Sequence, residues 1–166
     1  MVKAIFILVA YEIKTRIPLH LMILTKENHK DCKMILKMVD AIEAKYGRNT
    51  IRTVVYDRGF YDYEMFGEIN KQLIGFVTPS KRIGDLRRMV ESTPISSFSK
   101  IKRKDTNEYV MAYDTCTTLS GYEGKVRFII VEERYKRKKN GVEEIKKVRY
   151  GYLTNISNLP LVSGKK

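Results

Sequence analysis

The residue best placed to do chemistry is Asp57, which stands in the sequence Tyr-Asp-Arg-Gly-Phe at residues 56–60. It follows the β-branched, apolar run 50–56, which predicts a short central strand. A strand holds a carboxylate still, and Gly59 lets the chain turn away and leaves room for a phosphate group. Several carboxylates held in this way can bind Mg²⁺ for phosphodiester chemistry. The alternative interpretation is that Asp57 only caps the turn after the strand.

The second chemical feature is an excess of cationic side chains. The 32 lysines and arginines outnumber the 19 aspartates and glutamates, which gives a formal net charge of +13 and a pI near 9.7. Such an excess favours a polyanionic partner, and above all a nucleic acid, because phosphate neutralisation releases counterions. A lysine-rich surface that serves only solubility is the alternative.

The basic residues concentrate around a predicted hairpin. Asn140 and Gly141 favour a tight β-turn, and residues 134–149 around it carry eight basic and two acidic side chains, with Tyr135 and Tyr150 interleaved. Such a hairpin could follow a DNA backbone; alternatively, its lysines protect strand edges from pairing. Arg58 is the basic residue expected nearest a scissile phosphate, with an ion pair as its alternative role. We predict DNA contacts from Arg58, Lys81, Arg82, Arg134, Lys136, Arg137, Lys138, Lys139, Lys146, Lys147 and Arg149.

The elements that position Asp57 begin with a hairpin and a helix. The apolar runs at 3–12 and 19–25, separated by a polar turn, predict two antiparallel strands. Apolar residues then recur at intervals of three and four from residue 32 to residue 42, which predicts a helix. Asn28 can cap the start of this helix, and Gly47 can end it.

A second helix and a parallel strand follow Asp57. Asp62 is a suitable cap for a helix at about 63–73, and residues 75–78 predict a strand. Because this helix can act as a crossover, the strand at 50–56 can lie parallel to a neighbour. The composition changes after Lys81, where residues 82–155 predict a β-rich segment. We therefore divide the chain into an α/β core at 1–81 and a basic, β-rich part at 82–166.

Four stretches resemble the DDE-type transposases of insertion sequences. Residues 54–62 are similar to the segment around the second catalytic aspartate of that family, and Gly-Phe-Val-Thr-Pro-Ser-Lys at 75–81 is similar to the strand that follows it. The Pro-Leu pair at 18–19, with the polar stretch 25–31, resembles an upstream strand and loop. Tyr-Leu-Thr-Asn at 152–155 resembles the strand before the final catalytic helix.

The resemblance implies an RNase H-like mixed sheet with flanking helices and a β-rich insertion. It also implies DNA cleavage and joining, with Mg²⁺ or Mn²⁺ held by two aspartates and a glutamate, of which Asp57 would be the second ligand. The other two do not match this sequence, since the first strand would precede Met1 and the last helix would follow Asn155. We therefore expect a partial catalytic domain that binds little or no metal and has little activity alone.

Other properties limit where the protein works. No apolar run approaches the length of a membrane span, and the start of the chain lacks the features of a signal peptide. Cys32 and Cys116 have no metal-binding spacing, so we expect two reduced thiols and a cytoplasmic protein. Sheet edges left open by missing elements make a homo-oligomer a further expectation.

Two alternatives to a transposase domain remain open. One is a non-enzymatic nucleic-acid-binding module that keeps the RNase H-like fold and the basic face without an active site. The other is an unrelated basic α/β protein whose charge serves another purpose, such as assembly with a partner. DNA binding that depends on salt concentration separates these two alternatives.

Overall fold

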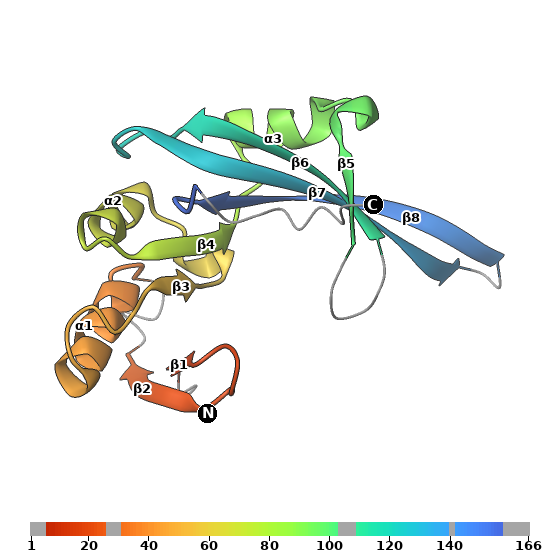
Figure 1. Cartoon of the computed structure of the whole chain (residues 1–166). Coiled ribbons are helices and arrows are strands. Elements are labelled where there is room, and N and C mark those ends of the chain that lie inside the picture. The colour runs from red at the N-terminus through yellow and green to blue at the C-terminus, as the bar shows by residue number, and fades with distance from the viewer. Residues whose placement is uncertain (1–5, 26–30, 103–108, 140–141, 158–166) are drawn as a thin grey trace.

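The computed structural model of the chain describes residues 6–25, 31–102, 109–139 and 142–157 (Figure 1). They form a mixed α/β structure with a two-stranded sheet, a six-stranded mixed sheet and three α-helices, so the predicted α/β class is confirmed. In chain order the elements are β1 (Phe6–Tyr11), β2 (Pro18–Leu24), α1 (Met34–Tyr46), β3 (Thr53–Val55), the 3-10 turn η1 (Arg58–Phe60), α2 (Tyr63–Lys71), β4 (Gly75–Pro79), α3 (Gly84–Ser92), the 3-10 turn η2 (Ile95–Ser97), β5 (Ser99–Lys102), β6 (Tyr109–Thr118), β7 (Lys125–Lys139) and β8 (Val142–Thr154).

The predicted N-terminal hairpin is confirmed. Strands β1 and β2 pair antiparallel, with Phe6 opposite Leu24, and form a sheet of their own. Helix α1 follows and buries one apolar face, which includes Ile35 and Val39. Gly47 ends this helix with a φ of 103°, a value that glycine adopts more easily than other residues. The predicted cap, Asn28, lies outside the described residues.

The segment around Asp57 has the predicted order of strand, helix and parallel strand. Asp62 caps α2, because its side chain accepts a hydrogen bond from the backbone N–H of Met65 at 3.0 Å. Helix α2 then acts as the crossover between β3 and β4, which pair parallel from Thr53 opposite Gly75. The parallel pairing of this strand is therefore confirmed.

The predicted central position of this strand is wrong for the part of the chain that the structure describes. The sheet order is β3-β4-β8-β7-β6-β5, so β3 is an edge strand. The apolar composition suggested a buried strand, but Thr53 and Val55 are exposed and only Val54 is half-buried. The position of a strand in its sheet depends on pairing with residues far away in the chain, which local composition does not indicate. Strand β1 does not extend this sheet, because it pairs with β2 in a separate one.

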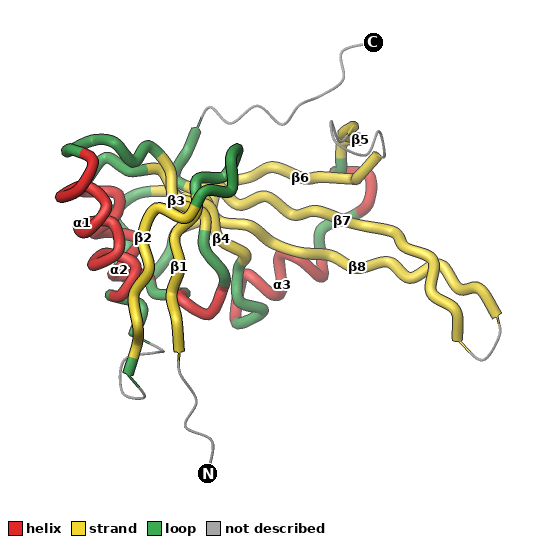
Figure 2. Tube along the Cα trace, turned by 90° about the horizontal axis from the view of Figure 1, so that it is seen from below, coloured by secondary structure: helices red, strands yellow, loops and turns green. Residues whose placement is uncertain are grey.

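The six-stranded sheet runs through the predicted boundary at residue 81. Strand β8 pairs antiparallel with β4 on one side and with β7 on the other, so strands from both parts of the chain share one sheet. Beyond Glu132, the last residue of β7 opposite β6, the paired strands β7 and β8 continue as a two-stranded arm. Figure 2 shows this arm extending past the rest of the sheet.

Helix α3 is a correction to the β-rich segment predicted from residue 82. Leu86, Met89 and Val90 lie three and four positions apart, and the buried side chains of Leu86 and Val90 face the core. The apolar face is short and is followed by a serine-rich stretch, so the helical period is easily missed. Thr93 and Pro94 follow the helix and end it.

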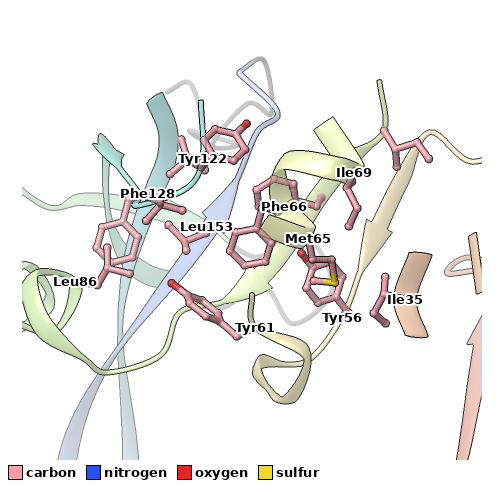
Figure 3. Close-up of a cluster of buried hydrophobic side chains, with 14 of the residues drawn as sticks. Ile35, Tyr56, Tyr61, Met65, Phe66, Ile69, Leu86, Tyr122, Phe128 and Leu153 are labelled. Atoms are coloured by element: carbon pink, nitrogen blue, oxygen red, sulfur yellow. The ribbon is translucent and has the colours of Figure 1, made fainter. Parts of the chain in front are cut away.

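The core joins the helices to the sheet. Phe66 of α2 stacks on Phe76 of β4 with ring centroids 4.9 Å apart, and both side chains are fully buried. Figure 3 shows the cluster continuing through Leu153 to Phe128. Burial of this apolar surface is the main favourable term in folding. Tyr56 belongs to this core and Val54 packs against it, so the core supports β3 and the Asp57 turn.

Candidate functional site

Asp57 lies two residues after the end of β3 and is exposed. Its side chain accepts a hydrogen bond from the backbone N–H of Arg58 at 2.8 Å and caps the turn η1. The structure therefore gives Asp57 the capping role that the sequence left open as an alternative. A Cβ atom on Gly59 would lie 3.9 Å from the Asp57 carboxylate, which is an ordinary contact, so a small side chain would fit at this position.

The described residues around Asp57 do not provide the ligands of a Mg²⁺ site. No group of three or more His, Cys, Asp and Glu side chains in the described part of the chain could hold a metal ion. Glu12 lines the same cavity as Asp57, but its carboxylate accepts a hydrogen bond from Thr15 N at 2.6 Å. Hydrogen bonds from Thr15 lower the pKa of Glu12. Because Mg²⁺ retains most of its waters and requires near-octahedral geometry, a single carboxylate is a poor site for it.

A basic groove adjoins the Asp57 turn at Arg58. It has a volume of about 550 Å³ and lies between η1, α3 and the strands of the arm. Its lining holds six cationic side chains, two tyrosines and one carboxylate. These residues are Arg58, Arg82, Arg87, Glu91, Lys146, Lys147, Arg149, Tyr135 and Tyr150. The groove brings together five of the predicted DNA contacts, although Arg58 and Lys146 are 88 positions apart.

The cations of this groove differ in their partners. Arg87, which the sequence did not single out, forms an ion pair with Glu91 of the same helix at 2.8 Å. The four-residue spacing of Arg87 and Glu91 could have indicated this ion pair, but only if the segment had been recognised as a helix. Lys146 and Lys147 are exposed on β8, on the arm. The surplus of positive charge makes the groove a suitable surface for phosphate groups.

Arg149 has a structural role in this groove. Its Nε atom donates to Glu132 at 3.0 Å, and one terminal nitrogen donates to the carbonyl oxygens of Val90, Glu91 and Thr93. These carbonyls lie at the C-terminal end of α3, where a cation is favoured by the helix dipole. Arg149 therefore joins α3 to the sheet, and its guanidinium is largely occupied by protein partners.

The two basic residues after β4 are held by aromatic rings. Lys81 donates to the carbonyl oxygen of Tyr61 at 3.4 Å, and its ammonium lies 5.3 Å from the centre of the Tyr61 ring. Arg82 donates to the carbonyl oxygen of Arg149 at 2.8 Å, and its guanidinium lies 5.9 Å from the Tyr150 ring. Arg82 is exposed within the groove, whereas Lys81 is half-buried outside its lining.

The remaining predicted DNA contacts lie on the arm. Arg134 approaches Glu132 at 3.4 Å, and Lys136 forms an exposed ion pair with Glu143 across the strands at 3.5 Å. The side chains of Arg137, Lys138 and Lys139 lie outside the described part of the structure. Neither Arg134 nor Lys136 lines the groove.

Two buried tyrosines lie close to the Asp57 turn. Burial raises the pKa of the Tyr56 and Tyr61 hydroxyls well above the ordinary range, so both remain protonated. Among the described residues, neither hydroxyl has a hydrogen-bond partner. Their rings pack against Phe66, and we assign them to the core rather than to catalysis.

No protein-family model matches the chain, and no curated protein matches it. Within the described residues, none of the helices is both long enough and apolar enough to cross a membrane.

Proposed function

We propose that the chain is a partial catalytic domain of a DDE-type transposase that binds DNA through the basic groove and does not cut DNA by itself. The observation that carries the proposal is the convergence of Arg58, Arg82, Lys146 and Lys147 on one groove beside the Asp57 turn. Phosphate neutralisation by several such side chains supplies most of the affinity of a DNA-binding surface.

The arrangement of elements supports the transposase part of the proposal. The carboxylate of Asp57 follows a strand that is parallel to β4, and a helix connects the two strands. The four stretches that resemble the family fall on β2, the β3–η1 turn, β4 and the end of β8. An RNase H-like core is the fold that the resemblance implies for this order.

The groove can position DNA without reading its sequence. Arginine and lysine contacts to phosphates fix the register of a duplex or a single strand but carry no base information. Tyr135 and Tyr150 line the same groove, and Tyr150 has the Arg82 guanidinium near its ring. An exposed tyrosine ring could also stack with an unpaired base. Strand cleavage is not part of the function proposed for this chain, since the described residues do not provide a group of metal ligands.

Salt-dependent DNA binding tests the proposal. Fluorescence anisotropy with labelled duplex and single-stranded DNA should show affinity that falls linearly with the logarithm of salt concentration. The double variant Lys146→Gln/Lys147→Gln should reduce the magnitude of that slope by about 2 if both lysines contact phosphates. The matched control is Lys37→Gln/Lys71→Gln, which removes the same charge from exposed positions on α1 and α2.

Two results would count against this function. Equal losses in the groove variant and in the control would mean that net charge alone governs binding. Absence of binding even at low ionic strength would remove both DNA-binding hypotheses and favour a basic α/β protein with another partner.

A non-enzymatic nucleic-acid-binding module is the second candidate. The observation that favours it is the absence of a metal-binding cluster among the described residues. Nicking of supercoiled DNA in the presence of Mn²⁺ distinguishes the candidates. A partial catalytic domain should produce nicks when it is mixed with an added domain that carries the missing carboxylates. A module without an active site should produce no nicks, either alone or in that mixture.

A further inference from the structure

A second cavity, of about 780 Å³, lies between the β1–β2 hairpin and strand β3. It is lined by consecutive residues of both walls, at 8–13 along β1 and just beyond its end, and at 53–57 along β3 and just beyond its end. Successive side chains of a strand point to opposite faces, so a cavity that contacts every residue in a run lies against the edge of the strand. Ile35, Val39 and Ile42 of α1 also line it, at helical spacing.

Backbone hydrogen bonds show which edge of β3 faces this cavity. Gly75 N donates to Arg52 O at 2.9 Å, and Tyr56 N donates to Val77 O at 3.2 Å, so residues 52 and 56 face β4. Because the backbone groups of a strand alternate in direction, Thr53 and Val55 point their N–H and C=O groups the opposite way. Within the described residues β3 pairs only with β4, which leaves that edge open.

Strand β1 offers the second open edge. Its only partner strand in the described part of the chain is β2. Figure 1 shows the hairpin as a separate ribbon pair beside β3, and the shared lining places the cavity between the two. An unpaired edge presents a row of donors and acceptors to other chains, so folded proteins usually protect or cover such an edge.

The lining determines which partner fits. Most of it is aliphatic, as in Leu8, Val9 and Val54, while Val55 at the rim is 57% exposed. A lipid or another hydrocarbon ligand would cover these side chains but would leave the N–H and C=O groups of both edges unpaired. An extended polypeptide presents donors and acceptors along both of its edges and apolar side chains toward α1.

We propose that this cavity is a strand-acceptor groove, in which an extended apolar peptide segment pairs with β1 and β3 and joins the two sheets into one. The occupant is a segment of polypeptide with alternating aliphatic residues. The proposal goes beyond DNA binding and does not depend on it, since the cavity and the basic groove share no lining residue.

A labelled peptide of alternating valine and threonine, acetylated and amidated, is the probe. Its fluorescence anisotropy should show saturable binding to the full chain. Val55→Pro removes the N–H that points into the groove and leaves the hydrogen bonds of residues 52 and 56 to β4 in place. We expect this variant to bind the peptide about tenfold more weakly. The control Val55→Thr keeps the N–H and should bind within about twofold of the original chain.

A second probe tests the proposal on the unmodified chain, so that the result does not depend on whether the proline variant folds. The same peptide with alternate backbone nitrogens methylated has no donors on one edge and should bind the unmodified chain about tenfold more weakly. Equal affinity for both peptides would overturn the proposal, and so would equal binding by a folded Val55→Pro chain. A dimer in light scattering that Val55→Pro converts to monomers, with no peptide binding, would assign the groove to a second copy and also overturn it.

Discussion

Glu132 and Arg149 form a buried ion pair across strands β7 and β8, with 3.0 Å between Oε2 and Nε. The Glu132 side chain is 4% exposed and the Arg149 side chain is 23% exposed. Arg149 also bonds to three carbonyl oxygens at the end of α3, so this one guanidinium connects two strands and a helix.

Replacement of Arg149 by methionine should lower the free energy of unfolding by about 3 kcal/mol, because the buried Glu132 carboxylate loses its closer cationic partner and keeps only Arg134, at 3.4 Å. Urea denaturation followed by circular dichroism measures the change. The double variant Arg149→Met/Glu132→Met should recover part of the loss, since it removes the unpaired charge. A loss below about 0.5 kcal/mol, the range of an ordinary surface substitution, would mean that the pair and the helix contacts add little.

Asn155 fastens the end of the sheet to the α2–β4 connection. Its Oδ1 accepts from Phe76 N at 2.8 Å, and its Nδ2 donates to Ile74 O and to Asn70 Oδ1, both at 3.0 Å. Asn155→Ala should cost about 2 kcal/mol, because part-buried backbone groups lose their partners. Asn70→Ala removes only one of these bonds and should cost less than half as much in the same urea titration. Similar losses for the two would show that the backbone bonds of Asn155 contribute little.

Two glycines should respond to alanine with opposite signs. A Cβ atom on Gly151 would lie 2.5 Å from both the Phe128 ring and Ser80 Oγ, and Phe128 is fully buried. Gly151→Ala should therefore destabilise the chain by about 2 kcal/mol or more, through overpacking. Gly67 lies inside α2, where a Cβ would make an ordinary contact at 3.8 Å, so Gly67→Ala should stabilise by about 0.5–1 kcal/mol. Thermal melts of the two variants should move in opposite directions; a shared direction would contradict the packing described for Gly151.

Elements with a clear period and a cap could be predicted from the sequence. Helix α2 has both, since Asp62 stands at its cap position and its apolar residues recur at helical spacing. Helix α3 has a shorter apolar face, and Ile83 at its cap position makes no side-chain cap, so the sequence alone favours a β-rich run after Lys81. The sequence indicated the basic residues before α3, Lys81 and Arg82, but neither the helix itself nor its Arg87.

Relationships between distant residues could not be predicted in this way. The groove joins Arg82 to Lys147, and the edge position of β3 depends on which strands pair, so both are set by long-range packing. The role of Arg149 also required the structure, because its partners Val90 and Thr93 are far away in the sequence. Charge alone suggested phosphate contacts for Arg149 and Lys147 equally, whereas burial and hydrogen bonds separate them.

The final prediction concerns Asp57 and its neighbour Arg58. Asp57 is a single carboxylate that accepts a hydrogen bond from Arg58 N, so we expect no tight metal site on the chain alone. The free-ion electron paramagnetic resonance signal of Mn²⁺ should fall equally little with the original chain and with Asp57→Asn. In the DNA anisotropy assay Asp57→Asn should not weaken binding, because it removes a negative charge, whereas Arg58→Gln should weaken it severalfold by removing a groove cation. A stoichiometric Mn²⁺ site that Asp57→Asn abolishes would contradict this prediction and would show that Asp57 shares a metal with ligands from elsewhere in the chain.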